Sequence, residues 1–139
     1  MSNEYEWATD PKWVQETMAG WDMSKPVGML NLLKFRRYAK YASDTNELPC
    51  SGAEAYSRYA VLIKPMLDAI GAKVTHSEYL TMLGPPDEWD RAFIVRYEHA
   101  SDLVNLTQNP DYHLVAPHRT AALADTRLVM MDFDDSGLF

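Results

Sequence analysis

Cysteine is almost missing from this sequence: Cys50 is the only one, so an intrachain disulfide is excluded. The first residues also lack the basic segment, apolar run and small-residue cleavage site of a secretory leader. Apolar runs stay well short of the roughly 20 residues that span a bilayer. We therefore expect a cytoplasmic protein in a reducing environment.

Positive charge is also in short supply. Thirteen Lys and Arg residues stand against twenty Asp and Glu, and the net charge of -7 repels nucleic acid and anionic membranes. We expect neither as a partner. One local exception is the basic cluster Lys34, Arg36, Arg37 and Lys40, which follows an apolar run. It either holds a small anion at a pocket mouth or is a solvated loop, the usual state of a charge run.

The chain has no internal repeat and no long linker, and 139 residues suffice for one core. Asp10-Pro11 is typical of a helix start, so residues 1–25 are predicted to form a helical extension. Its tryptophans Trp7, Trp13 and Trp21 favour docking on the body or on a second subunit. Residues 26–139 are predicted to form a single domain.

Hydrophobic periodicity predicts a fixed order of elements in this domain. Ser51 and Glu54 have capping-box spacing, and Pro117 interrupts the last helical pattern. The predicted elements are strand 27–35, helix 51–71, strands 73–83 and 89–98, a short helix capped by Ser101, a helix starting at Asn109-Pro110, and strand 126–133. This is the βαββαβ order of a ferredoxin-like α+β fold, in which helices cover one face of a four-stranded antiparallel sheet.

The opposite face of this sheet is expected to be apolar as well. In strand 89–98, Phe93, Val95 and Tyr97 point to one face, whereas Ala92 and Ile94 point to the other. A single layer of helices buries only one of these faces. We therefore expect a homodimer in which two sheets pack face to face.

Three short motifs, in this order, resemble the domain-of-unknown-function 1330 family over roughly residues 26–131. They are Asn31-Leu32-Leu33-Lys34-Phe35, the pair Tyr56 and Tyr59, and Pro110-Asp111-Tyr112 running into His118-Arg119. The resemblance implies a dimeric α+β barrel, a superfamily that includes cofactor-free monooxygenases, muconolactone isomerases, polyketide cyclases and haem-dependent chlorite dismutases. The resemblance implies the fold and the dimer more firmly than it implies a reaction. In such barrels the pocket usually lies between the sheet and the helices of each subunit.

Several polar residues are candidates for that pocket. Asn31 lies in the centre of an apolar strand, where it either orients a substrate or is a structural amide bonded to backbone. Tyr56 and Tyr59 share a helical face, so they either line the pocket with hydroxyls or are plain core. The other predicted ligand-binding residues are Lys34, Trp89, Tyr112 and His113.

The segment Asn109–Arg119 contains two of the four histidines. On a continuous helix Tyr112 and Arg119 would share a face, whereas His113 and His118 would diverge by about 140°. The histidines therefore form no chelating pair, and because no other ligand cluster is visible we expect no metal. If Pro117 instead starts a new helix, His118 and Arg119 fall in its positively polarised first turn.

The leading catalytic prediction pairs two of these residues. His118 would act as a general base near neutral pH, while Arg119 holds an enolate or carboxylate that develops during proton transfer. The alternative is a surface histidine beside an arginine that is salt-bridged to the sheet edge or to a partner subunit. His76 and His99 are weaker candidates, and no sequence feature indicates haem.

Two functions follow from these residues. The first is a cofactor-independent enzyme of monooxygenase, isomerase or cyclase type, acting on a small oxygenated aromatic or lactone-like compound. Its predicted catalytic residues are Asn31, Tyr56, His118 and Arg119. The second is a non-catalytic homodimeric module that binds a small ligand or an accessory partner.

Overall fold

The computed structural model describes residues 6–76 and 80–132. A short 3-10 helix, η1 (Glu6–Thr9), and helix α1 (Pro11–Thr17) precede strand β1 (Val27–Phe35). The remaining elements are α2 (Gly52–Ala69), β2 (Lys73–His76), β3 (Arg91–Tyr97), α3 (Ala100–Gln108), α4 (Pro110–Ala122) and β4 (Leu123–Met131). None of the helices in these ranges is long and apolar enough to cross a bilayer.

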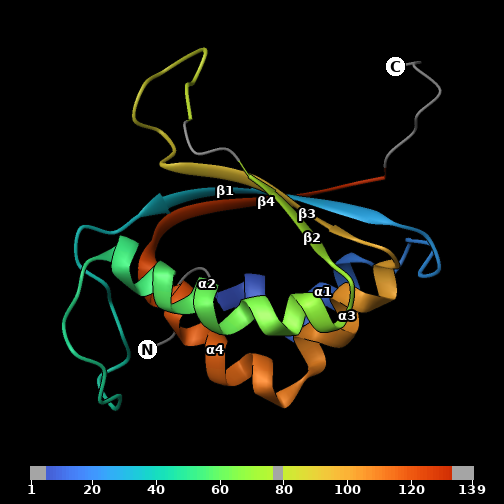
Figure 1. Ribbon diagram of the computed structural model, residues 1–139, viewed down its shortest axis with the longest axis horizontal. Coiled ribbons are helices and arrows are strands. Elements are labelled where there is room, and N and C mark those ends of the chain that lie inside the picture. Colours follow the sequence, from blue (N-terminus) through green and yellow to red (C-terminus); the bar gives the residue numbers. More distant parts are fainter. Residues whose placement is uncertain (1–5, 77–79, 133–139) are drawn as a thin grey trace.

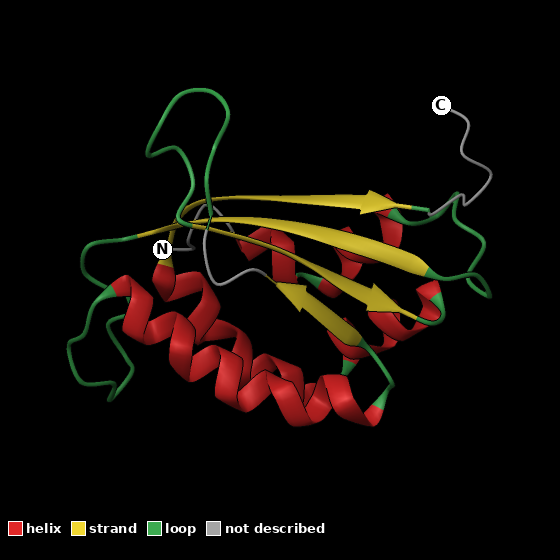
Figure 2. Cartoon of the chain, turned by 45° about the horizontal axis from the view of Figure 1, so that its top comes forward, coloured by secondary structure: helices red, strands yellow, loops and turns green. Residues whose placement is uncertain are grey.

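The four strands form one sheet in the order β2-β3-β1-β4, and all neighbouring strands are antiparallel. The helices lie together on one face of it (Figures 1 and 2). With α3 and α4 taken as one crossover, this is the ferredoxin-like α+β fold predicted from the sequence. The register aligns His76 with Phe93, Phe93 with Asn31, and Asn31 with Leu128. Directly paired residues point to the same face, so these four side chains form one row facing the helices.

Four helix starts were predicted from capping patterns, and three of them are confirmed. The Ser51 hydroxyl accepts a hydrogen bond from the Glu54 backbone N–H at 3.0 Å, and the Glu54 carboxylate accepts from the Ser51 N–H at 3.2 Å. Asp10 caps α1 by accepting from the Lys12 N–H at 3.0 Å. Asn109 caps α4 by accepting from the Asp111 N–H at 2.9 Å.

The predicted cap of the short helix is wrong by two residues. Helix α3 starts at Ala100, and its N-cap residue is His99 rather than Ser101. The Asp102 carboxylate accepts a hydrogen bond from the His99 backbone N–H at 3.2 Å. The acidic residue in the first turn therefore satisfies the backbone N–H of the N-cap residue, and Ser101 lies inside the helix instead of capping it.

The predicted strand bounds also need correction. Strand β2 ends at His76 and residues 80–83 are not in a strand, while the intervening 77–79 lie outside the described residues. The predicted start of the partner strand at residue 89 is also wrong, because β3 begins at Arg91. Trp89 therefore precedes β3. Strand β4 begins at Leu123, directly after α4, instead of at Thr126.

Helix α4 runs without a break from Pro110 to Ala122, so of the two alternatives the continuous helix is confirmed and Pro117 does not start a new one. A proline inside a helix removes the hydrogen bond to the carbonyl four residues earlier, here that of His113. Pro117 is exposed, and residues four apart share a helix face, so this carbonyl lies on the solvent side. Water can satisfy it, and the helix continues.

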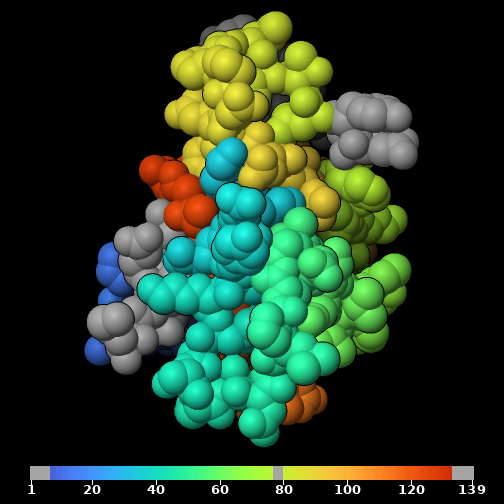
Figure 3. Space-filling view, turned by 90° about the vertical axis from the view of Figure 1, so that its left-hand side faces the viewer, coloured from blue at the N-terminus to red at the C-terminus, as the bar shows by residue number. Residues whose placement is uncertain are grey.

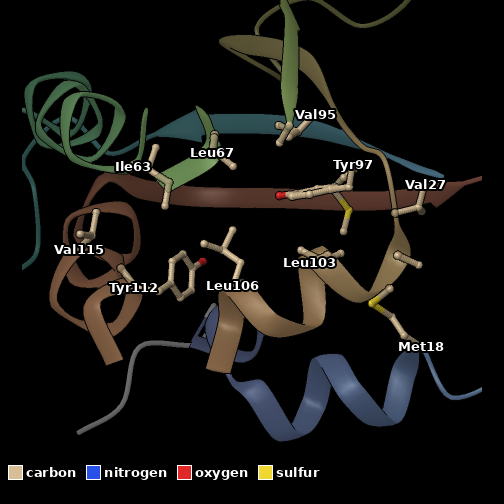
Figure 4. Packing of buried hydrophobic residues seen from close by; sticks show 14 residues of the cluster. Met18, Val27, Ile63, Leu67, Val95, Tyr97, Leu103, Leu106, Tyr112 and Val115 are labelled. Atoms are coloured by element: carbon tan, nitrogen blue, oxygen red, sulfur yellow. The ribbon is translucent and has the colours of Figure 1, made fainter. Parts of the chain in front are cut away.

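The N-terminal extension docks on the body of its own chain. Met18, at the end of α1, is fully buried and belongs to the main core together with Val27 and Leu103. Figure 4 shows Met18 directed from α1 toward these side chains. The Lys25 carbonyl also accepts a hydrogen bond from the Ala100 N–H at 2.7 Å. These contacts fix the extension below α3.

Candidate functional site

A cavity of about 1360 Å³ lies between the sheet and the helices. Five of the nine residues predicted from the sequence line it, and they come from β1, α2 and α4. They are Asn31, Tyr56, Tyr59, Tyr112 and Arg119. The helical phase that placed Tyr112 and Arg119 on one face of a continuous α4 is therefore confirmed.

Arg119 is a buried cation with little to neutralise it. The residue is 4% exposed, and its Nη2 donates one hydrogen bond, to the Thr126 hydroxyl at 3.3 Å. The Thr126 hydroxyl in turn donates to the Leu32 carbonyl at 2.9 Å. Among the described residues no carboxylate forms an ion pair with Arg119. A buried charge usually has an opposite charge beside it, so this guanidinium is suited to an anion that comes from outside the chain.

Four tyrosines surround the guanidinium. Burial raises the pKa of Tyr56 to about 12 and raises the pKa values of Tyr59, Tyr97 and Tyr112, while the positive charge of Arg119 partly offsets each shift. The hydroxyls therefore stay protonated at neutral pH and act as hydrogen-bond donors rather than bases. Figure 4 shows those of Tyr97 and Tyr112 directed into the space between sheet and helices.

The raised pKa of Tyr56 makes a testable difference to stability at high pH. The unfolded state loses this proton near pH 10, whereas the folded state keeps it up to about pH 12. Between these values the unfolded state binds fewer protons, so the free energy of unfolding falls as pH rises, by about 1.4 kcal/mol per pH unit for each such tyrosine. Urea unfolding at about pH 9, 10 and 11 measures the decline. Tyr56→Phe should make it shallower, and an unchanged slope would contradict the assignment.

The two polar atoms of the Asn31 side-chain amide have different surroundings. Its Nδ2 donates to the Met29 carbonyl at 3.1 Å, which is the structural role considered from the sequence. Among the described residues its Oδ1 has no hydrogen-bond partner, although the residue is only 7% exposed. The amide oxygen is thus left to accept a hydrogen bond from a bound molecule.

His118 does not share the cavity with Arg119. Its Nδ1 and the Tyr41 hydroxyl are hydrogen-bonded at 2.6 Å, and its Nε2 lies 3.9 Å from the Glu47 carboxylate. Arg58 of α2 pairs with the same carboxylate at 3.3 Å. This cluster ties the segment after β1 to α2 and α4. Figure 3 shows that segment, in cyan, beside the green of α2. The predicted pair of His118 and Arg119 therefore finds no geometric support, because adjacent helical residues leave α4 about 100° apart.

Three other predicted ligand-binding residues lie outside the cavity lining. Lys34 is on the opposite face of β1, where its Nζ donates to the Asp87 carbonyl at 2.7 Å and pairs with Asp90. The Trp89 ring lies under the Arg127 guanidinium, 5.7 Å from it. The His113 ring contacts the Thr107 carbonyl at 2.7 Å and so fastens α4 to the end of α3.

The sequence-based site missed the charge balance of the cavity. Four basic residues line it, whereas Asp68 is the only acidic one among the described lining residues, and Asp68 is paired with Lys64 at 2.8 Å. The basic residues are Lys64, Lys73, Arg91 and Arg119. They come from α2, β2, β3 and α4, so no spacing in the sequence connects them. In a chain of net charge -7, the cavity is locally cationic.

Two further groups of lining residues were not in the predicted site. His76, one of the weaker histidine candidates, lies at the exposed rim of the cavity, in the same row as Asn31. Trp7, Trp13 and Trp21 of the extension also line it. No three His, Cys, Asp or Glu side chains within residues 6–76 and 80–132 gather closely enough to hold a metal ion.

No family model and no curated protein matches the sequence. Solved structures do match. A crystal structure of the methylated RPA0582 protein is 33% identical, with a TM-score of 0.80 over 91% of this chain and 94% of that one. A second structure of RPA0582, a protein of unknown function from Rhodopseudomonas palustris, is 32% identical, with a TM-score of 0.74 over 86% and 91% of the two chains.

More distant structures share the fold alone. A dimeric protein of unknown function with a ferredoxin-like fold from Bacteroides fragilis is 15% identical, with a TM-score of 0.50 over 78% of this chain and 96% of that one. The hydroxynitrile lyase of Passiflora edulis is 9% identical, with a TM-score of 0.51 over 81% and 97%. At 33% identity over nearly the full length of both chains, this protein belongs to the same family as the RPA0582 protein of Rhodopseudomonas palustris.

Proposed function

We propose that this protein is a cofactor-independent enzyme of isomerase type, which moves a proton on a small oxygenated compound held in the cavity. The domain-of-unknown-function 1330 family, predicted from the sequence motifs, and a cytoplasmic location are part of this proposal. The observation that carries it is Arg119, a buried guanidinium without a carboxylate partner among the described residues, in the wall of a cavity of about 1360 Å³.

Arg119 is suited to stabilise a developing oxyanion. When a base removes a proton from the carbon next to a carbonyl, the electron pair of the C–H bond moves to the carbonyl oxygen and makes an enolate. A fixed cation and protonated hydroxyls that already face this oxygen lower the barrier, because they need no rearrangement during the reaction. Burial keeps the Tyr56, Tyr59 and Tyr112 hydroxyls protonated. The Tyr59 and Tyr112 hydroxyls are hydrogen-bonded to each other, so together they have one proton left to donate to the oxyanion.

His76 is the candidate base that the cavity offers. It is the only histidine among the described lining residues, and it shares a row with Asn31, two strand spacings away. This separation is about 10 Å, and the Phe93 side chain stands between the two, so a bound ring would lie over Phe93 with His76 and Asn31 on either side. The imidazole would accept the proton and return it at another carbon of the enolate, so that an isomerisation needs no further reactant.

A non-catalytic binding module is the second candidate function. The observation in its favour is the exposure of His76, because a rim histidine in contact with water is poorly placed to exchange a proton selectively with a bound compound. Such a module would use Arg119 and Asn31 for binding alone.

A ligand screen followed by proton exchange tests both functions. We expect members of a metabolite library to raise the melting temperature of the wild type, and to lose this effect in Arg119→Met. Arg127→Met, an exposed arginine of β4 that does not line the cavity, is the matched control and should keep it. Hits that stabilise Arg119→Met equally would contradict the proposal.

Each hit is then incubated with the protein in D2O. An enzyme incorporates deuterium at the carbon next to the carbonyl, and His76→Ala abolishes the incorporation without abolishing binding. Binding without exchange would establish the module instead of the enzyme.

We also propose that the chain forms a homodimer through the uncovered face of the sheet. Apolar side chains of the three strands β1, β3 and β4 occupy this face, which carries no helix (Figure 2). They include Leu30, Leu32, Ile94 and Val129, the last 42% exposed. Two such faces packed together would remove this area from water. Sedimentation should give twice the monomer mass, and Leu32→Asp should give monomers; a monomeric wild type would contradict the proposal.

A further inference from the structure

The wall of the cavity has two chemically different parts, and the second is built by the N-terminal extension. The first consists of Arg119 and the tyrosines of α2 and α4 that line the cavity with it. In the second, η1 and α1 contribute aromatic and apolar side chains to the wall. Three of the four tryptophans of the chain belong to this wall, namely Trp7, Trp13 and Trp21. The clustering shows that the extension is part of the cavity and not only a support for α3.

Trp13 is unusual because it is not needed for the core. It is 53% exposed although it lines the cavity, whereas Met18, close by in the sequence, is fully buried and holds the extension in place. The indole is therefore free to stack on a bound molecule. Aromatic rings favour other aromatic rings over alkyl chains of the same area, through stacked and edge-to-face geometries.

The positive charge of the cavity lining favours a ligand that carries an anionic group. Among residues 6–76 and 80–132 the lining has four basic residues and a single acidic one, and Arg119, 4% exposed, has one neutral hydrogen-bond partner there. An anionic oxygen would supply the missing counter-charge, whereas a cation would be repelled. The volume of about 1360 Å³ exceeds the roughly 300–1,000 Å³ of common ligand pockets, which favours more than a single ring.

We propose that the ligand is an aromatic carboxylate of two or more rings, with its carboxylate on Arg119 and its rings on the tryptophan wall. This rests on the proposed use of the cavity as a ligand site, and it assigns Trp13 as a specificity-determining residue. The N-terminal extension thereby decides which compounds the cavity accepts.

Calorimetric titration with three probes tests this assignment: 2-naphthoate, the neutral 2-naphthylmethanol, and the aliphatic decanoate. We expect 2-naphthoate to bind most tightly. Arg119→Met should weaken its binding roughly 10- to 100-fold, the effect of one charge-assisted contact, and leave the alcohol unchanged. Trp13→Leu should weaken 2-naphthoate roughly 2- to 10-fold and leave decanoate unchanged. Trp89→Leu, the tryptophan outside the cavity lining, should change none of the three affinities.

The outcomes separate this inference from the proposed function. Equal binding of the alcohol and the carboxylate would overturn the anionic end, and equal binding of decanoate and 2-naphthoate would overturn the aromatic wall. If none of the probes binds, the ligand class is wrong. The proposed function is decided independently, by whether library hits of any class depend on Arg119.

Discussion

Replacing Gly52 by alanine is expected to destabilise the protein by about 3 kcal/mol, which lowers the melting temperature by roughly 10 °C for a chain of this length. A Cβ atom built on Gly52 would lie 2.2 Å from the Arg36 carbonyl oxygen and 2.6 Å from that of Ala122. Both contacts are with backbone, and the Gly52 N–H already donates to the same Arg36 carbonyl at 3.0 Å. Relief therefore requires moving the start of α2 away from β1 and from the end of α4.

The direction of this effect follows from the magnitudes. Alanine is favoured over glycine in a helix by at most about 1 kcal/mol, less than the cost of the overlap. Gly20→Ala is the matched control, because a Cβ there meets nothing within 4 Å, and we expect a change within about 0.5 kcal/mol. Chemical unfolding of the two variants measures the difference. Equal stabilities would show that α2 can shift at no cost.

Arg119→Met is expected to stabilise the ligand-free protein by about 1 kcal/mol while removing its ability to bind anions. The guanidinium loses its hydration on folding and receives one neutral partner, Thr126, in return. Methionine has similar length and no charge to desolvate. A protein that keeps such an arginine gives up stability for a function at that position.

The tyrosines provide a second measurement of the same variant. Because the charge of Arg119 lowers the pKa values of Tyr56, Tyr59, Tyr97 and Tyr112, its removal should shift their ultraviolet titration to higher pH. Arg127→Met removes an exposed cation that pairs with Asp125 and should leave the titration unchanged. Destabilisation by Arg119→Met in the absence of ligand would mean that the guanidinium is structural.

Local sequence patterns predicted most of the fold because each depends on contacts within a few residues. The capping box of Ser51 and Glu54 is closed within one turn, and the Asn109-Pro110 start of α4 needs only its own first turn. Bounds that depend on a partner strand were predicted less well. Strand β4 begins at Leu123 rather than at Thr126 because Leu123 already pairs with Phe35 of β1, a contact that no pattern inside β4 records.

The predicted site shows the same difference between local and non-local relations. Helical phase placed Tyr112 and Arg119 on one face, since that relation is internal to α4. The same helix directs His118 to Tyr41, which is 77 positions away in the sequence. In the sequence, a histidine next to an arginine suggests a catalytic pair. In the structure, His118 is hydrogen-bonded to Tyr41, whereas Arg119 lines the cavity.

The order of the elements, the ferredoxin-like α+β fold and the burial of Asn31 and Tyr56 could all be predicted from local patterns. Which charges and aromatic rings meet depends on how the elements pack. Lys64, Lys73, Arg91 and Arg119 come from four different elements, and Trp13 belongs to an extension separate from all of them. These residues come together by non-local packing, which requires no fixed spacing along the chain. The cationic and aromatic parts of the cavity wall can therefore be recognised only in the folded structure.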